Sequence, residues 1–408
     1  MLKQIPVSQL KTGMFIHAVD INLSLFPDIS IQSTITNQSN LQKIIETGVK
    51  EVIIDTDKGS DIGEAGLETL KHQLTITHAR KKRRAIPPPE LPDIQASSYE
   101  DELETAKRLK HTALSSLKHA FSDVKMGIKI QTKEIKQSVK LFIDSIIRNQ
   151  DALLTLGQIR SKNTYMYDHA INTCVLTLVF CKWKNIDYDT TINMGIAALL
   201  HDIGETRLDD NLITFKGNLD EQQYIQMQEH VKFSVDLLSS FMGIHPQIVK
   251  LVQQHHERLD GSGYPNGLSG DEIDPLAQIL GMIDLYDSMT ADTMYSYALS
   301  PTQVLKQLLE SHNEMFDSVL IKQFIKCIGI YPVGSLVKLS NGCIAIINEI
   351  THHDSLHPKV KMIYNARQEH FIQPIDIDLS ELVKKGQAIS IKGCIDPNIL
   401  HIDLAAFI

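Results

Sequence analysis

The sequence has few cysteines and no long apolar run, and each shortage excludes a class of protein. Its five cysteines are odd in number and form no Cys-x-x-Cys pair, which argues against a disulfide framework or a zinc ribbon. No apolar stretch approaches the roughly 20 residues that a membrane-spanning helix needs. The first residues lack the apolar core of a secretory signal. We therefore expect reduced thiols, no membrane span and a cytoplasmic location.

The sequence also lacks an excess of basic residues. It contains 40 Lys and Arg against 49 Asp and Glu, a formal net charge of -9, so we expect no general affinity for DNA or RNA. A polyanionic substrate would need metal ions or a local basic patch. The hydrophobic content of 43% is typical of a globular protein, and 408 residues are enough for two or three domains.

Four segments differ in their residue patterns. Residues 1–78 are typical of a small α/β domain, with strand-like runs at 14–19 and 51–55 and a helix signal beginning near residue 39. Residues 79–97, basic and then rich in proline, indicate a linker. Residues 98–330 are helical, whereas residues 331–408 form a short β-rich appendage that begins with a hairpin at Asn341-Gly342. The predicted fold class is mainly α, a helical bundle with a small α/β N-terminal domain and this C-terminal appendage.

The helical segment carries a periodic apolar stripe and, further along, a set of residues that could bind metal. His201 and Asp202 end the apolar run 192–200 and would bring an imidazole nitrogen and a carboxylate oxygen to one divalent ion. Alone, this pair is weak evidence, because such pairs arise by chance. The same region supplies further residues of the same kinds. The predicted metal ligands are His169, His201, Asp202, His230, His255, His256 and Asp284.

Seven ligands exceed the four that a structural zinc ion needs. They suit two metal ions about 3.5–4 Å apart that share one carboxylate, and we predict Asp202 as this bridge. Two such ions neutralise phosphoryl oxygens and generate a metal-bound hydroxide, which favours phosphodiester hydrolysis. The alternative is a set of core histidines that each bind a backbone carbonyl. It would account for any one histidine but poorly for the whole set.

The order of these residues resembles that of the HD-GYP family, a bacterial branch of the HD-domain metallophosphohydrolases. The resemblance rests on the run 201–204, on His230, on the run 255–265 and on Asp284. It implies an all-helical HD domain that holds two or three metal ions, often iron or manganese, on the same seven ligands. It also implies hydrolysis of a cyclic dinucleotide, chiefly cyclic di-GMP and in some members 3′,3′-cyclic GMP-AMP.

Three positions depart from the family pattern. Members with three metal ions carry a Glu where this chain has Tyr165, so we expect two ions and a linear dinucleotide as the product. We expect iron or manganese, with zinc, nickel and magnesium as alternatives. The family's Lys after the His-Asp pair is Glu205 here, and the Arg of a later Arg-Pro-Tyr motif is Thr293. Losing both basic residues would weaken phosphate binding, because each charge-assisted hydrogen bond contributes roughly 1.5–3 kcal/mol.

Glu205 reverses a charge close to the expected phosphate position. It could form an ion pair with Arg207 or a neighbouring Lys, bind a guanine edge or carry a proton, and we favour the ion pair. Tyr264 could equally stack on a base or pack against the bundle. The candidate catalytic residues are His201, Asp202 and Asp287, and the candidate substrate-binding residues are Glu205, Arg207, Lys216, Arg258, Ser262 and Tyr264.

A second hypothesis is a catalytically weak or silent receptor for cyclic dinucleotides, which would signal through the N-terminal domain. The substitutions at Glu205 and Thr293 favour it, whereas the complete ligand set favours an enzyme. A homodimer or a signalling-protein partner is compatible with either hypothesis.

Overall fold

The computed structural model describes residues 2–7, 10, 14–19, 33–35, 51–55 and 94–408, except for 131, 161–163, 216, 218, 292–297, 312–313, 352–353, 388 and 396–401. The chain divides into two compact units, Met1–Lys81 and Lys82–Ile408. The four-part division, with boundaries at 78, 97 and 330, stays a prediction. None of the described helices is both long and apolar enough to cross a membrane.

An antiparallel sheet forms the described part of the first unit. Its strands lie in the order β1-β4-β2-β3, and the predicted strands are confirmed as β2 and β4, whereas β1 and β3 were not predicted. The helix expected near residue 39 and most of the predicted linker lie outside the described residues. The strands are β1 (Leu2–Pro6), β2 (Phe15–Val19), β3 (Ser33–Thr34) and β4 (Glu51–Asp55).

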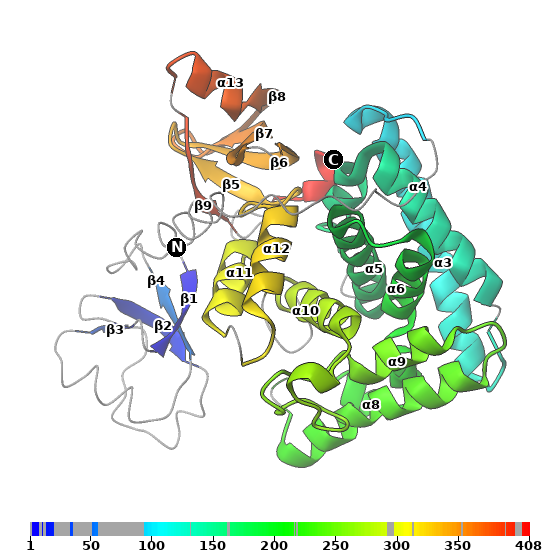
Figure 1. Ribbon diagram of the computed structural model, residues 1–408. Helices are drawn as coiled ribbons and strands as arrows, with labels where there is room; N and C mark the ends of the chain where they lie inside the picture. Colours follow the sequence, from blue (N-terminus) through cyan, green and yellow to red (C-terminus); the bar gives the residue numbers. More distant parts are fainter. Residues whose placement is uncertain are drawn as a thin grey trace. The chain divides into compact units, whose positions relative to one another are not determined.

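The second unit is mainly helical, which confirms the predicted fold class. Its long helices α3 and α4 run side by side, and α5 and α6 pack next to α4 (Figure 1). The helices are α3 (Tyr99–Lys125), α4 (Thr132–Leu156), α5 (Tyr165–Lys184), α6 (Tyr188–Leu200), α7 (Asp210–Ile213), α8 (Glu221–Ser240), α9 (Pro246–Gln254), α10 (Pro275–Met289), α11 (Pro301–Glu310) and α12 (Ser318–Ile328).

Residue patterns explain where these helices lie. In α4 the residues at 135, 139, 142, 143 and 146 form one stripe, and all of them are buried. By contrast, every residue of α5 from 168 to 181 is buried, as expected for a central helix with neighbours on all sides. The carboxylate of Asp220 begins α8 by accepting a hydrogen bond from the backbone N–H of Gln223, whose side chain binds back to the Asp220 N–H.

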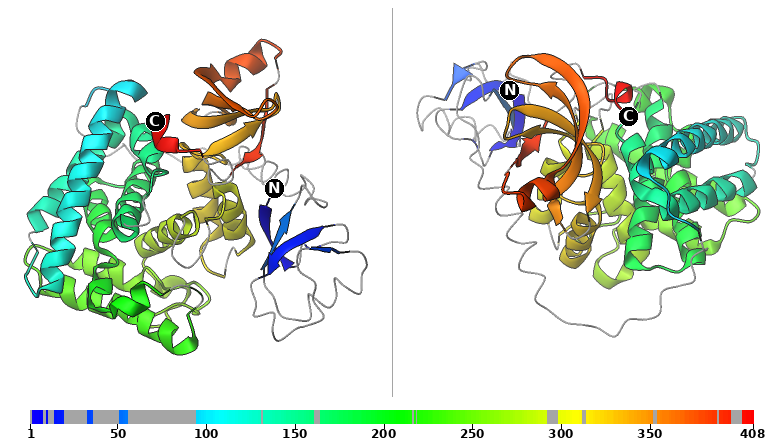
Figure 2. Two further views of the ribbon diagram at one scale, coloured as in Figure 1. Left: turned by 180° about the vertical axis from the view of Figure 1, so that it is seen from behind. Right: turned by 90° about the horizontal axis from the view of Figure 1, so that it is seen from above.

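A five-stranded antiparallel sheet follows the helices. The strands lie in the order β8-β7-β6-β5-β9, and the predicted hairpin joins β5 to β6. The sheet contacts the helices through β6 on α4 and β9 on α11. At the chain's end, the Nζ of Lys107 in α3 donates to the Ile408 carbonyl at 3.1 Å, and the C-terminal turn lies against the helices (Figure 2). The elements are β5 (Leu336–Leu339), β6 (Cys343–Thr351), β7 (Asp354–Asn365), β8 (His370–Asp378), α13 (Leu379–Lys384) and β9 (Ile391–Cys394).

Candidate metal centre

Five helices bring the seven predicted ligands to one place. His169 lies in α5, His230 in α8 and Asp284 in α10, whereas the two adjacent pairs, 201–202 and 255–256, directly follow α6 and α9. Two glycines permit this approach. A Cβ at Gly204 would collide with the His230 carbonyl, and one at Gly281 with the His255 carbonyl.

Three of the histidines share one hydrogen-bonding arrangement. In His201, His230 and His255, Nδ1 lies 2.6–2.9 Å from the carbonyl oxygen three residues earlier. A carbonyl only accepts, so Nδ1 carries the hydrogen and Nε2 carries a free lone pair. All three Nε2 atoms are buried, and none has a hydrogen-bond partner among the described residues. An unsatisfied buried group costs about 1–3 kcal/mol, and a metal ion removes this cost. The residues therefore fit divalent metal ions.

Asp202 has the geometry of a bridging ligand. Its Oδ2 lies 3.1 Å from Nε2 of His201 and 3.8 Å from Nε2 of His169. Its Oδ1 lies 3.3 Å from Nε2 of His230 and 3.7 Å from Nε2 of His255. The His201 contact is short but lacks the angle of a hydrogen bond. One carboxylate thus presents a different oxygen to each pair of histidines.

The ligand atoms form three overlapping groups. Two of them share Asp202: the His169 half contains His169, His201 and Asp202, and the His230 half contains Asp202, His230, His255 and His256. The third group joins the halves through His201, His255 and Asp284. Within each group, the ligand atoms all lie within 4.8 Å of one another. Asp284 adds a second carboxylate, whose Oδ1 lies 3.0 Å from Nε2 of His169 and whose Oδ2 lies 3.9 Å from Nδ1 of His256.

The carboxylates make the centre attractive to positive charge. Burial would raise the pKa of Asp284, but the hydrogen bond from His169 and the nearby imidazole of His201 hold that pKa well below its usual value. The pKa of Asp202 is also lowered, against the effect of burial, by the charge of His201. Burial disfavours the charged form of His169, yet Asp284 and Asp287 raise its pKa to about 9. Cations are therefore stabilised where the ligand atoms meet.

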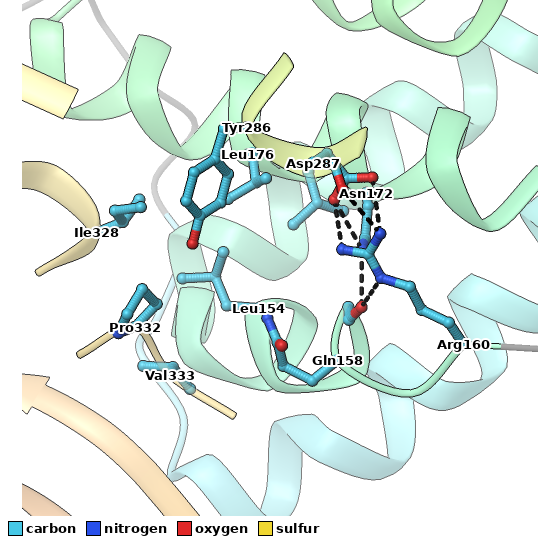
Figure 3. A pocket seen from close by; sticks show the side chains of 12 residues that line it. Leu154, Gln158, Arg160, Asn172, Leu176, Tyr286, Asp287, Ile328, Pro332 and Val333 are labelled. Carbon is cyan, nitrogen blue, oxygen red and sulfur yellow. Dashed lines mark hydrogen bonds and ion pairs between the residues drawn. The ribbon is translucent and has the colours of Figure 1, made fainter. Parts of the chain in front are cut away.

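Asp287 lies behind His169 rather than in the opening. Its Oδ2 accepts a hydrogen bond from Nδ1 of His169 at 2.8 Å. Its Oδ1 accepts from Nη2 of Arg160 at 2.7 Å and from Nδ2 of Asn172 at 3.1 Å (Figure 3). The side chain is fully buried and both oxygens are occupied. Its surroundings are those of a positioning residue, and the catalytic role that the sequence suggested stays a prediction.

The sequence analysis missed both partners of Asp287. The sequence did indicate that Asp287 lies near the ligands, because Asp287 follows Asp284 by three residues and so lies on the same face of α10. Arg160 also donates to the Gly157 carbonyl at 3.0 Å, as does Asn172 at 2.7 Å. These contacts fix the turn after α4 against the side chain that holds His169.

Glu257, which the sequence analysis also missed, anchors the glycine-rich loop 260–267. Its buried carboxylate accepts the backbone N–H groups of Asn266 at 2.8 Å and of Leu268 at 2.9 Å. At Gly263 a Cβ would collide with the backbone of residues 256–258. The loop is therefore held in one conformation directly over the end of α9.

The loop places two candidate substrate-binding residues in different settings. Tyr264 stacks on the imidazole of His256, with ring centroids 4.6 Å apart. Ser262 is exposed, and its backbone N–H donates to Asp260 at 2.9 Å. Tyr264 therefore packs against a predicted metal ligand, one of the two roles that its position left open.

Arg258 points into the protein. Its guanidinium donates to the carbonyls of His255 at 3.0 Å and Glu257 at 2.9 Å, and lies 4.8 Å from the ring centre of Phe316. Only 9% of the residue is exposed. The structure therefore gives Arg258 an anchoring position, and its contact with substrate stays a prediction.

Glu205 does not pair with Arg207, so the prediction of an ion pair with Arg207 is wrong. Glu205 is half-buried in the 3-10 helix Ile203–Arg207, and no ion pair joins these two described residues. With three residues per turn, positions 205 and 207 point in different directions. Arg207 is exposed, whereas burial and then the charge of Asp202 raise the pKa of Glu205 to about 8. Lys216 and Thr293 lie outside the described residues.

Tyr165 occupies the position where a third metal ion would need a carboxylate. Its ring stacks on His169, with centroids 5.7 Å apart and planes inclined by 8°. Burial, together with the charge of Asp287, raises the pKa of this phenol. The hydroxyl therefore stays protonated and adds no anionic ligand.

The chain is similar to several known proteins. An HD domain model matches residues 155–320, and a model of a domain of unknown function, DUF3391, matches residues 2–135. A cyclic di-GMP phosphodiesterase of Pseudomonas aeruginosa is 30% identical over 394 residues, which are 96% of this chain and 92% of that protein. A 3'3'-cGAMP-specific phosphodiesterase of Vibrio cholerae is 27% identical over 172 residues, which are 42% of this chain and 37% of that protein. The solved structure of a HDG"Y"P protein from Bdellovibrio bacteriovorus aligns with a TM-score of 0.46 and 16% identity, covering 79% of this chain and 98% of that one.

Proposed function

The chain belongs to the HD-GYP family of HD-domain phosphohydrolases, and we propose from this premise that it hydrolyses cyclic di-GMP or 3′,3′-cyclic GMP-AMP with two metal ions. The Pseudomonas aeruginosa relative, 92% of which aligns with this chain, is a cyclic di-GMP phosphodiesterase, so cyclic di-GMP is the first substrate to test. The proposed product is the linear dinucleotide, and the favoured metals are iron and manganese.

One observation in the structure carries the proposal. Three buried imidazole Nε2 atoms surround the Asp202 carboxylate without hydrogen-bond partners in the described part of the chain. Core histidines that serve only the fold would have both ring nitrogens satisfied. A set of lone pairs around a shared carboxylate is the donor set of a two-metal phosphodiesterase.

Each residue of the centre has a definite task in this reaction. When bound, divalent ions supply Lewis acidity toward phosphate oxygens and activate water at neutral pH. His201, His230 and His255 hold their lone pairs inward, because their Nδ1 hydrogens are bound to carbonyls. Asp202 joins the two halves, and Asp287 fixes the orientation of His169.

The opening of the centre is acidic. Glu205 is half-buried next to Asp202, Arg258 is turned inward, and Arg207 is exposed. Without a metal ion, a substrate phosphate would therefore meet net negative charge. With Arg207 excluded as its partner, Glu205 keeps two proposed roles, a hydrogen bond to a guanine edge and the carriage of a proton.

The test is turnover by protein reconstituted with iron(II) or manganese(II). We expect cyclic di-GMP or 3′,3′-cyclic GMP-AMP to be converted to the linear dinucleotide, as resolved by chromatography. His201→Ala should bind less metal and lose turnover. Equal rates in the wild type and in His201→Ala would contradict the proposal. Tight dinucleotide binding without turnover at full metal occupancy would instead favour the silent receptor.

A further inference from the structure

An aromatic path leads from the metal centre to the protein surface. The imidazole of His256 stacks on the ring of Tyr264, with centroids 4.6 Å apart and planes inclined by 27°. The ring of Tyr264 meets that of Tyr224 nearly at right angles, with centroids 6.4 Å apart. Tyr224 therefore lies one side chain beyond Tyr264, which itself contacts a predicted metal ligand.

Tyr224 is much more exposed than a tyrosine that serves only the core. Of its surface, 52% is accessible, and no side-chain hydrogen bond joins it to another residue in the described ranges. It lies six residues before His230 on α8, about 9 Å along the helix axis. A single exposed aromatic residue is ordinary. Tyr224, however, lies beside Tyr264, the ring that stacks on His256, and this position next to a predicted metal ligand indicates a role in binding.

The centre has few other means to hold a nucleobase. Metal ions would engage phosphate oxygens, whereas Arg258 is buried and the half-buried Glu205 has no flat apolar face for a base. A cyclic dinucleotide also presents two flat purines that need apolar contact. Stacking of a base on an aromatic side chain contributes about 1–3 kcal/mol and tolerates any base, because every base has a π face.

We propose that Tyr224 is a substrate-binding residue that stacks on one purine of a cyclic dinucleotide whose phosphate lies at the metal centre. This inference rests on the proposed function. Tyr264 contacts Tyr224 from the protein side, with the two rings nearly perpendicular, and the exposed part of the Tyr224 ring is available to a base. Tyr224 would then favour base-bearing diesters over small diesters without bases, and would not discriminate guanine from adenine.

The test compares Tyr224→Ala, Tyr224→Phe and the control Ile225→Ala, which alters the neighbouring exposed residue. For Tyr224→Ala we expect a rise of about 10-fold in KM and in the equilibrium Kd for cyclic di-GMP. We expect kcat within about twofold and unchanged metal content, because Tyr224 is not a predicted ligand. Hydrolysis of methyl p-nitrophenyl phosphate, which has no base, should be unchanged. Tyr224→Phe keeps the ring and should behave like the wild type, as should Ile225→Ala.

The outcomes separate this inference from the proposed function. If the wild type binds cyclic di-GMP without cleaving it, the proposed function fails, and a 10-fold weaker Kd in Tyr224→Ala still supports the stacking role. Unchanged KM and Kd in Tyr224→Ala would overturn the stacking role while leaving the function intact. A wild type that neither binds nor cleaves any cyclic dinucleotide would overturn both.

Discussion

The two halves of the metal centre are built differently around one shared carboxylate. In the His169 half, the Nδ1 of His169 donates to the carboxylate of Asp287, which Arg160 and Asn172 hold in turn. In the His230 half, the Nδ1 atoms of the buried histidines donate to neutral backbone carbonyls. An imidazole whose Nδ1 hydrogen is bound to a carboxylate is a stronger electron donor to a metal ion than one whose Nδ1 hydrogen is bound to a carbonyl. We therefore expect the His169 half to bind its metal ion more tightly.

The largest effect should come from removing one histidine of either half. His169→Ala and His230→Ala should each lower the metal content from two equivalents to one. Each should also reduce kcat by more than about 100-fold, which exceeds the loss caused by mutating a residue that only contacts a metal ligand. If the halves differ as described, the ion that remains in His169→Ala should dissociate more readily than the one in His230→Ala. Competition with a chelator measures both. Equal affinities for the remaining metal ion in the two variants would contradict the expected difference between the halves.

The next largest effect should come from Asp287→Asn, which keeps the size of the side chain but removes its charge. Loss of a partner behind a metal-binding histidine costs about 10–100-fold in metal affinity. We expect this loss in the His169 half alone, with kcat reduced in parallel under limiting metal. Excess metal should restore kcat, which a variant damaged only in its fold would not show. A matched loss of affinity in both halves would contradict the separate roles.

A smaller effect is expected from Glu205→Gln, which removes the negative charge that Glu205 carries beside Asp202 above its pKa of about 8. Two like charges about 4 Å apart repel by about 4 kcal/mol at an effective dielectric of 20, and metal ions and salt reduce this. At a pH above 8 we expect kcat/KM for cyclic di-GMP to rise by about 3- to 10-fold, and at a pH below 7 we expect a smaller change. Glu229→Gln changes the net charge equally at an exposed position and should leave kcat/KM unchanged. A large loss of activity with full metal content would show that the carboxylate of Glu205 takes part in the reaction.

The smallest effect on activity is expected at Asp151, a buried acid without the cationic partners that Asp287 has. Burial, and then the charge of Glu349, raise the pKa of Asp151 to about 7. The folded protein therefore holds this proton more tightly than the unfolded chain does. Its contribution to stability is favourable at low pH and is lost as the pH rises through about 7.

Asp151→Asn should remove this dependence. Between pH 5 and pH 8, the Tm of the wild type should fall relative to that of Asp151→Asn. The expected fall is about 2–4 °C for each kcal/mol by which the free energy of unfolding of the wild type decreases relative to that of the variant. Activity should stay within about twofold. Glu134→Gln, at an exposed position on the same helix, serves as the control. Parallel Tm profiles for the wild type and Asp151→Asn would contradict the raised pKa.

The sequence predicted the elements whose residue patterns are local. The helical character of residues 98–330 was predicted from their residue patterns, and the hairpin from β5 to β6 followed from Asn341-Gly342. Strands β8 and β9 were missed, because β8 is largely exposed and lacks a clean alternation of apolar and polar residues. Such strands are specified by their neighbours rather than by their own residues.

The same distinction holds at the metal centre. The ligand set was found because seven residues of the right kinds follow one another in a helical region. Their partners Arg160, Asn172 and Glu257 were missed, because each acts through a contact with a residue distant in the chain or with the backbone. Arg258 was assigned to the substrate because of its charge, whereas the structure shows that packing against Phe316 decides its direction.

The most direct test of the central claim, one carboxylate joining two metal sites, is the metal content of Asp202→Ala. Asp202 presents Oδ2 to His201 and Oδ1 to His230, so its removal should weaken both halves at once. Elemental analysis of protein purified without added metal should find about two equivalents in the wild type and close to none in Asp202→Ala. Retention of one full equivalent by Asp202→Ala, or an absence of metal from the wild type, would contradict the claim.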